Sequence, residues 1–297
     1  MRAFNLPSVF VVTKGGLGNQ LFQISISHYL SSALQMNVVH LEPHLPKIRR
    51  TGRDGIDVWP SYVDELTEFR VICRTSSQVL ASLSAKFLTA DALLGKFRRR
   101  LNRRFDKWLN YDLPTIEFDA LLPSGPRWIN YSGSSLIGAA HSRELIIEAL
   151  ERICFEHESC RSLKSLALKS QPIIVHWRRG DYVGLEDIYG NLTSDYYNQS
   201  IENLSDGSRP VWLITDAVGE EASKLAESVH AQQVFDGTAE FGAVCLLNLM
   251  RRHVGLVCSN STFSWWAAFL SDGAIAHPSE YLDCQVNIFR DLPLVLE

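Results

Sequence analysis

The stretch IIVHWRRGDYVG, residues 173–184, joins a run of apolar residues directly to a cluster of charges. Its first five residues have the short, branched and apolar character of a buried strand, and Arg178, Arg179 and Asp181 follow at once. Gly180 lets the backbone turn sharply, and Asp181 can hold one guanidinium in place. Two planar, permanently charged guanidinium groups suit the oxygens of a phosphate. The stretch therefore predicts a strand that ends in an anion-binding turn.

After this strand, apolar strands and amphipathic helices alternate toward the end of the chain. The expected strands are 173–177, 210–214, 233–235, 254–258 and 274–277. The expected helices are 194–204, 219–229, 240–252 and 262–271. Alternation of this kind indicates a mostly parallel sheet covered by helices, and ligands of such sheets bind beyond the carboxyl ends of the strands. The charged turn lies at such an end.

The beginning of the chain shows a similar succession. An apolar run at 8–13 is followed by the glycine turn KGGLGNQ, by an amphipathic helical pattern and by a second strand at 38–41. A further helix is expected at 143–156, whereas residues 43–135 show no regular pattern. This half of the chain therefore also predicts an α/β unit, although less completely.

The length and composition are those of a soluble globular protein. The chain has 297 residues, of which 46 % are hydrophobic and 21 % are charged. We predict the α/β class, with two Rossmann-like domains that are joined near residues 160–171. The formal net charge of −4 provides no global positive field, which argues against a nucleic-acid partner, so any anion has to be bound locally.

The sequence also predicts a cytoplasmic location. The N-terminus has no apolar stretch of signal length, and no run is long enough to span a bilayer. The cysteines are scattered without a C-x-x-C pair, and we expect them to be buried reduced thiols. They are Cys73, Cys154, Cys160, Cys245, Cys258 and Cys284.

Two further segments fall at the ends of predicted strands. SNSTFSWWAAFL, residues 259–270, opens with helix-capping residues, and the amides at a helix N-terminus form an anion site with the helix dipole. GGLGNQLFQ, residues 15–23, permits close approach of a ligand to the backbone, but it matches neither a P-loop nor the dinucleotide fingerprint. Each of the three segments, taken alone, also has a purely structural interpretation. The stretch 173–184 could end in an exposed loop with an ion pair, 259–270 could be a capped core helix, and 15–23 could be a simple glycine turn.

Together, GGLGNQLFQ, HWRRGDY and SNSTFSWWAAFL, in this order, resemble the signatures of the alpha-1,2-fucosyltransferase family, and the resemblance covers residues 14 to about 270. Members of this family, bacterial ones included, transfer L-fucose from GDP-fucose to a galactose 2-hydroxyl with inversion and without a divalent metal. They do so on a GT-B scaffold of two Rossmann-like domains that face each other across a cleft. The resemblance implies that residues 1–165 form the acceptor side and that residues 166–297 bind GDP-fucose through its diphosphate. It also implies a galactose-terminated glycan as acceptor.

Residue roles follow from the resemblance position by position. Arg178 would be the main β-phosphate ligand, with His176 beside the same diphosphate. Ser261, Thr262 and the amide of Phe263 would cap the phosphates from the helix N-terminus. The remaining donor-site positions are Asn19, which would approach across the cleft, Asp181, Asp216 and Asn260, and Asp236, which would recognise guanine or ribose.

The same residues suggest how the reaction proceeds. As GDP departs, charge develops on the β-phosphate, and a fixed arginine with aligned amides stabilises that charge. The sequence contains no Asp-x-Asp, so arginine and the helix dipole are expected to replace a metal, and no cofactor is expected. Arg178, His176 and Glu186 are the candidate catalytic residues, with Glu186 as general base. Glu186 could equally well belong to a solvated acidic loop, and the reaction could proceed without a general base.

Some positions depart from the family pattern. The strand that usually ends in Phe-Ser-Asp-Asp ends here in WLITDA, where Asp216 matches and Ala217 replaces the second acid. Trp177 stands where a small aliphatic residue is common. Two alternatives therefore stay open: another linkage such as alpha-1,6, and a non-catalytic GDP-sugar or glycan-binding module. The second would lose Arg178, which this chain keeps.

The segment KFRRRLNRRFDKWL, residues 96–109, concentrates basic residues in an otherwise acidic chain. Phe97, Leu101, Phe105 and Trp108 recur at helical spacing, so a helix here would be apolar on one side and cationic around the rest. Such a helix could meet an anionic membrane at its inner face, which suits assembly of a bacterial surface polysaccharide on a lipid carrier. Packing of the apolar side on the protein, with solvated arginines, is the alternative.

Overall fold

The structure is a computed structural model that describes residues 8–13, 15–42, 61–73, 127–129, 136–205, 207–236, 241–291 and 294. The chain divides into two compact units, Met1–Glu144 and Leu145–Glu297.

The first unit contains a parallel sheet of four described strands. They are β1 (Ser8–Val12), β2 (Asn37–Glu42), β3 (Arg70–Cys73) and β4 (Arg127–Ile129), in the spatial order β3-β2-β1-β4. The helix α1 (Leu17–Ser32) follows β1, and the short helix α2 (Val63–Leu66) precedes β3. The predicted strands 8–13 and 38–41 are confirmed, whereas β3 and β4 lie in the part of the sequence that showed no regular pattern.

The second unit contains a parallel sheet of five strands. They are β5 (Ile173–Trp177), β6 (Val211–Thr215), β7 (Gln233–Phe235), β8 (Gly255–Val257) and β9 (Ala274–Ala276), in the order β7-β6-β5-β8-β9. Counted along the chain this is 3-2-1-4-5, the order of a Rossmann sheet. The five strands lie within one residue of the predicted ranges at each end, because buried parallel strands read as continuous apolar runs.

The strand order places a switch point between β5 and β8. From β5 the chain continues outward to β6 and β7 on one side, and it later returns to add β8 and β9 on the other. At such a point the connections leave in opposite directions, which opens a crevice at the carboxyl ends of the two strands. The turn that starts at Arg178 and the segment that starts at Cys258 both lie there.

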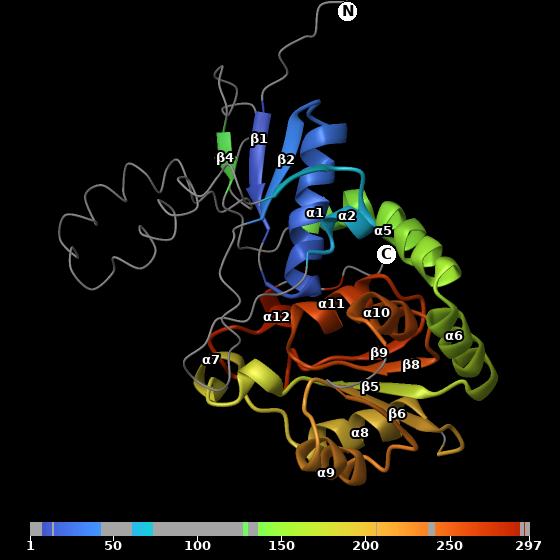
Figure 1. Cartoon of the computed structure of the whole chain (residues 1–297). Coiled ribbons are helices and arrows are strands. Elements are labelled where there is room, and N and C mark those ends of the chain that lie inside the picture. The colour runs from blue at the N-terminus through green and yellow to red at the C-terminus, as the bar shows by residue number, and fades with distance from the viewer. Residues whose placement is uncertain are drawn as a thin grey trace, which may run out of the picture. The chain divides into compact units, whose positions relative to one another are not determined.

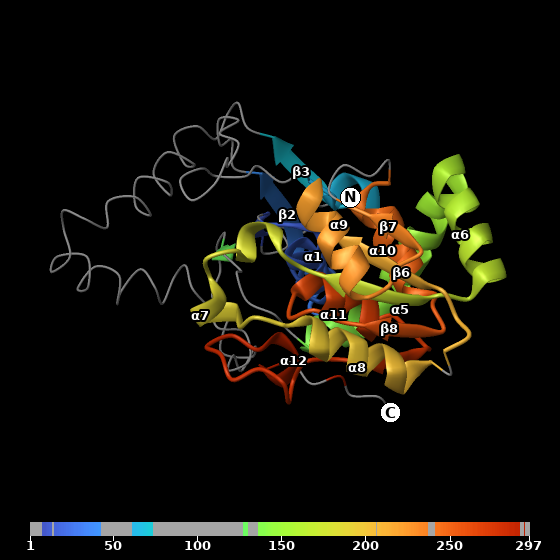
Figure 2. The same ribbon diagram turned by 90° about the horizontal axis from the view of Figure 1, so that it is seen from below.

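Helices cover both faces of the second sheet. After α5 (Leu136–Glu156) and α6 (Glu158–Ser170), the chain forms α7 (Glu186–Tyr189), α8 (Ser194–Leu204), α9 (Glu220–Ser228), α10 (Ala243–Arg251), α11 (Thr262–Phe269) and α12 (Ile288–Asp291). Figure 1 shows α8 and α9 on one face of the sheet and α10 and α11 on the other. Figures 1 and 2 both show α7 at the end where the chain leaves β5. The α/β class with two Rossmann-like sheets is therefore confirmed.

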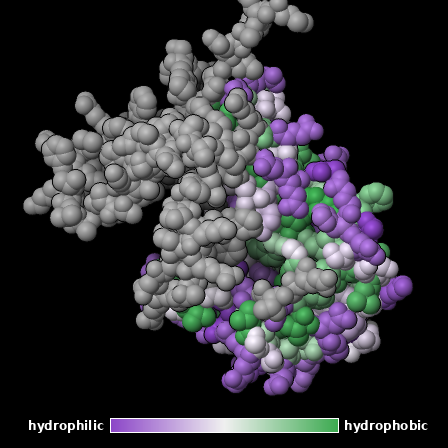
Figure 3. Space-filling model, in the orientation of Figure 1, coloured by the Kyte–Doolittle hydropathy of each residue, from purple (hydrophilic) through white to green (hydrophobic). Residues whose placement is uncertain are grey.

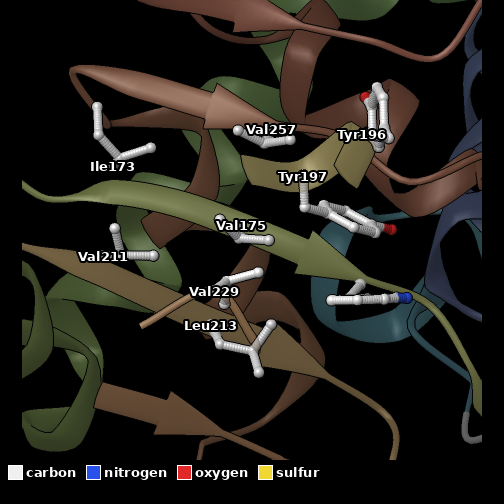
Figure 4. Close-up of a cluster of buried hydrophobic side chains, with 9 residues drawn as sticks. Ile173, Val175, Tyr196, Tyr197, Val211, Leu213, Val229 and Val257 are labelled. Carbon is white, nitrogen blue, oxygen red and sulfur yellow. The ribbon is translucent and has the colours of Figure 1, made fainter. Parts of the chain in front are cut away.

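Alternate residues of β5 form the core toward α8. Ile173, Val175 and Trp177 pack in one cluster with Tyr196 and Tyr197 of α8 (Figure 4). The rings of Trp177 and Tyr197 stack with their centroids 4.0 Å apart. The large side chain of Trp177, unexpected in the sequence motif, is therefore accommodated in the core under the charged turn.

The division between the units falls within α5, earlier than the predicted boundary at residues 165 and 166. The second half of α5 and α6 belong with the second unit because their side chains contact α10. Glu151 of α5 pairs with Arg251, with Arg252 and with Lys164 of α6. Such ion pairs across three helices leave no sign in the local sequence pattern.

One disulfide corrects the expectation about cysteines. Cys160 of α6 and Cys245 of α10 are disulfide-bonded, with their Cα atoms 5.5 Å apart, so the expectation of reduced thiols is wrong for this pair. The two residues lie 85 positions apart and meet because α6 packs against α10, which the spacing of cysteines could not indicate. Cys154, Cys258 and Cys284 are not disulfide-bonded.

The visible surface of the described residues shows hydrophilic and hydrophobic side chains interspersed (Figure 3). Within the described ranges, every helix is too short or too polar to cross a membrane. The basic segment 96–109 lies outside the described residues.

Candidate functional site

The turn after β5 is organised by one carboxylate. Asp216, which follows β6, pairs through Oδ2 with Nη1 of Arg178 at 3.0 Å. Its Oδ1 accepts a hydrogen bond of 2.6 Å from the backbone N–H of Arg179. A single side chain on the neighbouring strand thus fixes both the guanidinium of Arg178 and the path of the backbone beyond it. Charge-assisted contacts of this kind are among the stronger ones in proteins.

Gly180 leaves room for that carboxylate. A Cβ atom at this position would lie 2.1 Å from Oδ2 of Asp216, far inside van der Waals contact. The glycine is therefore required by the close approach of a neighbouring side chain. It begins the short 3₁₀ helix Gly180–Tyr182, which carries the chain toward α7.

The second arginine is held differently from the first. Nε of Arg179 pairs with Glu221 of α9 at 3.0 Å, and both side chains are partly exposed. The guanidinium of Arg178 instead lies over the ring of Tyr182, 5.5 Å from its centroid. The side chain of Asp181 lies outside the described part of the structure, so its predicted contact with a guanidinium stays a prediction.

The segment after β8 leads into the N-terminus of α11. Ser261 is the N-cap, and its hydroxyl accepts a hydrogen bond of 3.1 Å from the amide of Ser264. Thr262 and Phe263, half-buried, form the start of the first turn, where helix geometry provides no carbonyl for the amide groups. The helix dipole adds partial positive charge at this end. The predicted capping segment is therefore an ordered helix start beside the end of β5.

His176 connects the two segments from inside the protein. Its Nδ1 lies 2.5 Å from Oγ of Ser264 and 3.0 Å from Oγ of Ser259, and the residue is buried. Burial, with the positive charge of Arg178 second, lowers the pKa of His176 to about 3. The imidazole is therefore neutral near pH 7, and its hydrogen bonds connect β5 to α11 and to the segment before it.

Asn260 holds the loops around the site. Its Nδ2 donates to the carbonyl oxygens of Tyr189, at 2.8 Å, and Val286, at 2.7 Å. Its Oδ1 accepts from the amide of Ile288 at 2.8 Å. The side chain thus joins the end of α7 to the segment before α12, and its two N–H groups are already used by the protein.

A small cavity of about 20 Å³ lies beside Arg178, between the turn and α7. Its wall consists mostly of aromatic and polar side chains. The lining residues are Trp177, Arg178, Arg179, Tyr182, Glu186, Tyr189, Gly190, Asn191, Leu192, Tyr197, Ser259 and Asn260. Tyr182 and Tyr189 stack on each other with centroids 4.3 Å apart. Glu186 begins α7, is exposed, and accepts a hydrogen bond of 3.0 Å from the amide of Gly184.

The structure brings most of the predicted site residues together at one end of the second sheet. Direct contacts join His176 to the first turn of α11 and Arg178 to Asp216. The start of α11 also contributes the predicted residues Asn260, Ser261, Thr262 and Phe263. Asp236 follows β7, two strands away from β5 in the same sheet, and is half-buried. Asn19 belongs to the first unit, where it is exposed on the first turn of α1.

Sequence reasoning missed three contributors to this end of the sheet. Glu221 pairs with Arg179, and the aromatic residues Tyr189 and Tyr197 line the cavity. In the sequence these three residues are only acidic or aromatic residues near the starts or ends of helices. Nothing in the local pattern indicates which strand end they lie beside.

Comparisons with known proteins identify the family of the chain. Residues 8–278 match the profile of the family described as Glycosyl transferase family 11. The O-antigen biosynthesis glycosyltransferase WbnK of Escherichia coli is 25 % identical over 282 residues, which cover 86 % of this chain and 88 % of WbnK.

Two solved structures are similar to this chain at low sequence identity. The alpha-1,6-fucosyltransferase NodZ of Bradyrhizobium, crystallised with GDP, is 14 % identical with a TM-score of 0.49, covering 90 % of this chain and 93 % of NodZ. POFUT1 in complex with GDP is 14 % identical with a TM-score of 0.47, covering 90 % of this chain and 95 % of POFUT1. The fold itself is established by the strand order of the two sheets.

Proposed function

The chain belongs to glycosyl transferase family 11, and from that premise we propose that it transfers L-fucose from GDP-fucose to the 2-hydroxyl of a galactoside in a surface glycan. One observation carries the proposal. At the switch point of the second sheet, an arginine fixed by a carboxylate lies beside the capped N-terminus of α11. This combination of a planar cation and a helix start suits a diphosphate.

In the proposed reaction the galactose 2-hydroxyl oxygen attacks C1 of fucose from the face opposite the nucleotide. A C1–O bond forms to the acceptor, and the bond between C1 and the β-phosphate oxygen breaks with its electron pair remaining on the phosphate. The configuration at C1 inverts, and GDP leaves with one additional negative charge. Arg178 and the first turn of α11 stabilise that charge more strongly in the transition state than in bound GDP-fucose.

The other predicted residues take supporting roles in this proposal. Asp216 positions Arg178, and neutral His176 positions the start of α11. Glu186, at the cavity wall, accepts the proton that the acceptor hydroxyl loses. Asn260 and Ser261 keep the loop and helix start in place, while Asp236 contacts the donor from the end of β7.

The donor is tested first by hydrolysis of GDP-fucose, GDP-mannose and UDP-sugars by the purified protein. We expect GDP-fucose to be turned over fastest. An acceptor panel of galactosides follows, and the linkage of the product is determined by NMR. A fucosyl product with a 1→2 bond to galactose is expected. A product with a 1→6 bond would show that the proposed 1→2 linkage is wrong. Binding of GDP-fucose without any product would favour a non-catalytic module.

We further propose that transfer needs no divalent metal. The sequence has no Asp-x-Asp with which glycosyltransferases commonly hold a metal against the diphosphate, and Arg178 is placed to supply the compensating charge. Turnover should therefore be unchanged after incubation with excess EDTA. If chelation abolishes turnover and manganese restores it, the assignment of charge compensation to Arg178 is wrong.

A further inference from the structure

Arg178 has an aromatic neighbour in addition to the carboxylate of Asp216. The guanidinium carbon Cζ of Arg178 lies over the ring of Tyr182, 5.5 Å from the ring centroid. A cation within about 6 Å of a ring centroid is attracted by the electron-rich face of the ring. The side chain of Arg178 is only 18 % exposed, so water screens this attraction less than it would on an open surface.

The backbone of the turn holds Tyr182 in this position. Its amide donates to the carbonyl oxygen of Arg179 at 2.7 Å, and its carbonyl oxygen accepts a hydrogen bond of 2.9 Å from the amide of Leu185. The side chain is half-buried. The ring is therefore attached to a short segment whose backbone is fixed directly beside the arginine.

A second tyrosine supports the first. The rings of Tyr182 and Tyr189 stack with their centroids 4.3 Å apart and their planes 14° from parallel. Tyr189 is the last residue of α7, and its carbonyl oxygen accepts a hydrogen bond of 2.8 Å from Nδ2 of Asn260, in the segment before α11. A continuous series of contacts thus runs from that segment through Tyr189 and Tyr182 to Arg178.

A ring and a carboxylate restrain a guanidinium in different ways. Asp216 binds Nη1 of Arg178, and a single contact at one end of the planar group leaves it able to rotate about that contact. The face of Tyr182 attracts the whole cation, and it does so without an oxygen that would occupy an N–H group. Together the two restraints fix the direction of the guanidinium, which decides how well it meets phosphate oxygens.

We propose that Tyr182 is a positioning residue whose ring, supported by Tyr189, orients the guanidinium of Arg178 toward the β-phosphate of the donor. This inference rests on the proposed function, because it takes the diphosphate to bind at Arg178. It assigns the effect to the aromatic ring of Tyr182. Phenylalanine should therefore replace the tyrosine, and leucine should not.

The test compares Tyr182→Leu and Tyr182→Phe with the matched control Tyr281→Leu. Tyr281 also packs on the ring of another tyrosine, Tyr196, with the centroids 4.8 Å apart. Two quantities are measured for each protein: the Kd of GDP by calorimetry, and the rate at which Arg178 reacts with the arginine reagent phenylglyoxal, followed by peptide mass spectrometry. The second quantity reports on the environment of the guanidinium without any ligand.

Tyr182→Leu should weaken GDP binding roughly fivefold, because the attraction between ring and cation is lost. It should also speed the reaction of Arg178 with phenylglyoxal, since the guanidinium loses the ring that covers it. Tyr182→Phe and Tyr281→Leu should keep the Kd within about twofold of wild type and leave the reaction rate unchanged. If Tyr182→Leu does not fold, Tyr182→Met takes its place, because methionine fills more of the space of the ring without an aromatic face.

Three results would overturn the inference. An unchanged Kd in Tyr182→Leu would show that Asp216 alone orients the arginine. Equal weakening in Tyr182→Phe would assign the effect to the hydroxyl. An unchanged reaction rate of Arg178 in Tyr182→Leu would show that any weaker binding comes from a general loss of structure. If the wild-type protein does not bind GDP, the proposed function fails by itself, and the reaction rate of Arg178 still decides whether Tyr182 positions it.

Discussion

The turn after β1 and the turn after β5 occupy the same place in two sheets whose first four strands have the same order, yet different side chains build them. In the first unit an uncharged amide side chain holds the described residues of the turn. Gly15 has a φ of 77°, and Nε2 of Gln20 donates to its carbonyl oxygen at 2.8 Å. Oε1 of Gln20 in turn accepts from the amide of Tyr62 at 2.9 Å. The side-chain amide of Gln20 thus connects this turn to the segment before α2 in the same unit.

In the second unit the corresponding turn is held by charges. Asp216 comes from the next strand of the sheet and fixes both Arg178 and the backbone of Arg179. The helix start nearby also differs: Ser261 caps α11 with its side chain, whereas the N-cap of α1, Gly16, makes no side-chain cap. The comparison shows that the same strand order can be completed by different side chains. At the second turn a neighbouring strand provides the carboxylate that fixes two consecutive residues.

Replacement of Arg178 by lysine should produce the largest effect, since it removes the planar fork while it keeps the charge. We expect kcat/KM for GDP-fucose to fall about a hundredfold, on the order of 3 kcal/mol of transition-state stabilisation. Arg179→Lys, which alters the exposed pair with Glu221, should be much milder. Near wild-type turnover of Arg178→Lys would show that the reaction does not need the planar guanidinium at the second turn.

Gly180→Ala tests the close packing of the second turn. The new Cβ would force the Asp216 carboxylate to move by more than about 1 Å, so its contacts with Arg178 and Arg179 should weaken and kcat/KM should fall roughly tenfold. Gly242→Ala is the matched control, because nothing lies within 4 Å of its added Cβ. Equal activity of the two alanine variants would mean that the carboxylate is not held as tightly as the turn requires.

Substitution of a buried histidine in each unit should give the smallest effect, a change in how the stability of the protein depends on pH. Burial lowers the pKa of His40, on β2, to about 4, and burial with Arg178 lowers that of His176 to about 3. The unfolded chain takes up these protons as the pH falls through about 6.5, whereas the folded chain does not. Their contribution to stability is therefore complete above pH 6.5 and is lost progressively toward pH 4 and pH 3.

Thermal unfolding between pH 7 and pH 5 measures this loss. The Tm of the wild-type protein should fall with pH, and His40→Gln and His176→Gln should each flatten the dependence. A Tm profile that neither substitution changes would show that other groups cause the loss of stability in acid.

The sequence predicted the elements of the second unit better than their arrangement. Segments such as 173–177 and 194–204 were found because apolar runs and helical periodicity are local signals. The short strands β3 and β4 were missed because RVIC and RWI carry too little pattern to identify an element. The position of Asp216 beside Arg178 depends on the adjacency of β5 and β6, and the capping role of Ser261 beside them depends on the adjacency of β5 and β8. Those neighbours are set by packing over long distances in the chain.

The claim that the turn after β5 binds the diphosphate is tested most directly by calorimetric titration of GDP into four proteins: wild type, Arg178→Lys, Asp216→Asn and the double variant. We predict that Arg178→Lys weakens GDP binding about tenfold, that Asp216→Asn weakens it by a similar or smaller factor, and that the double variant is little worse than Arg178→Lys, because Asp216 acts through Arg178. An unchanged Kd for GDP in Arg178→Lys would contradict the claim.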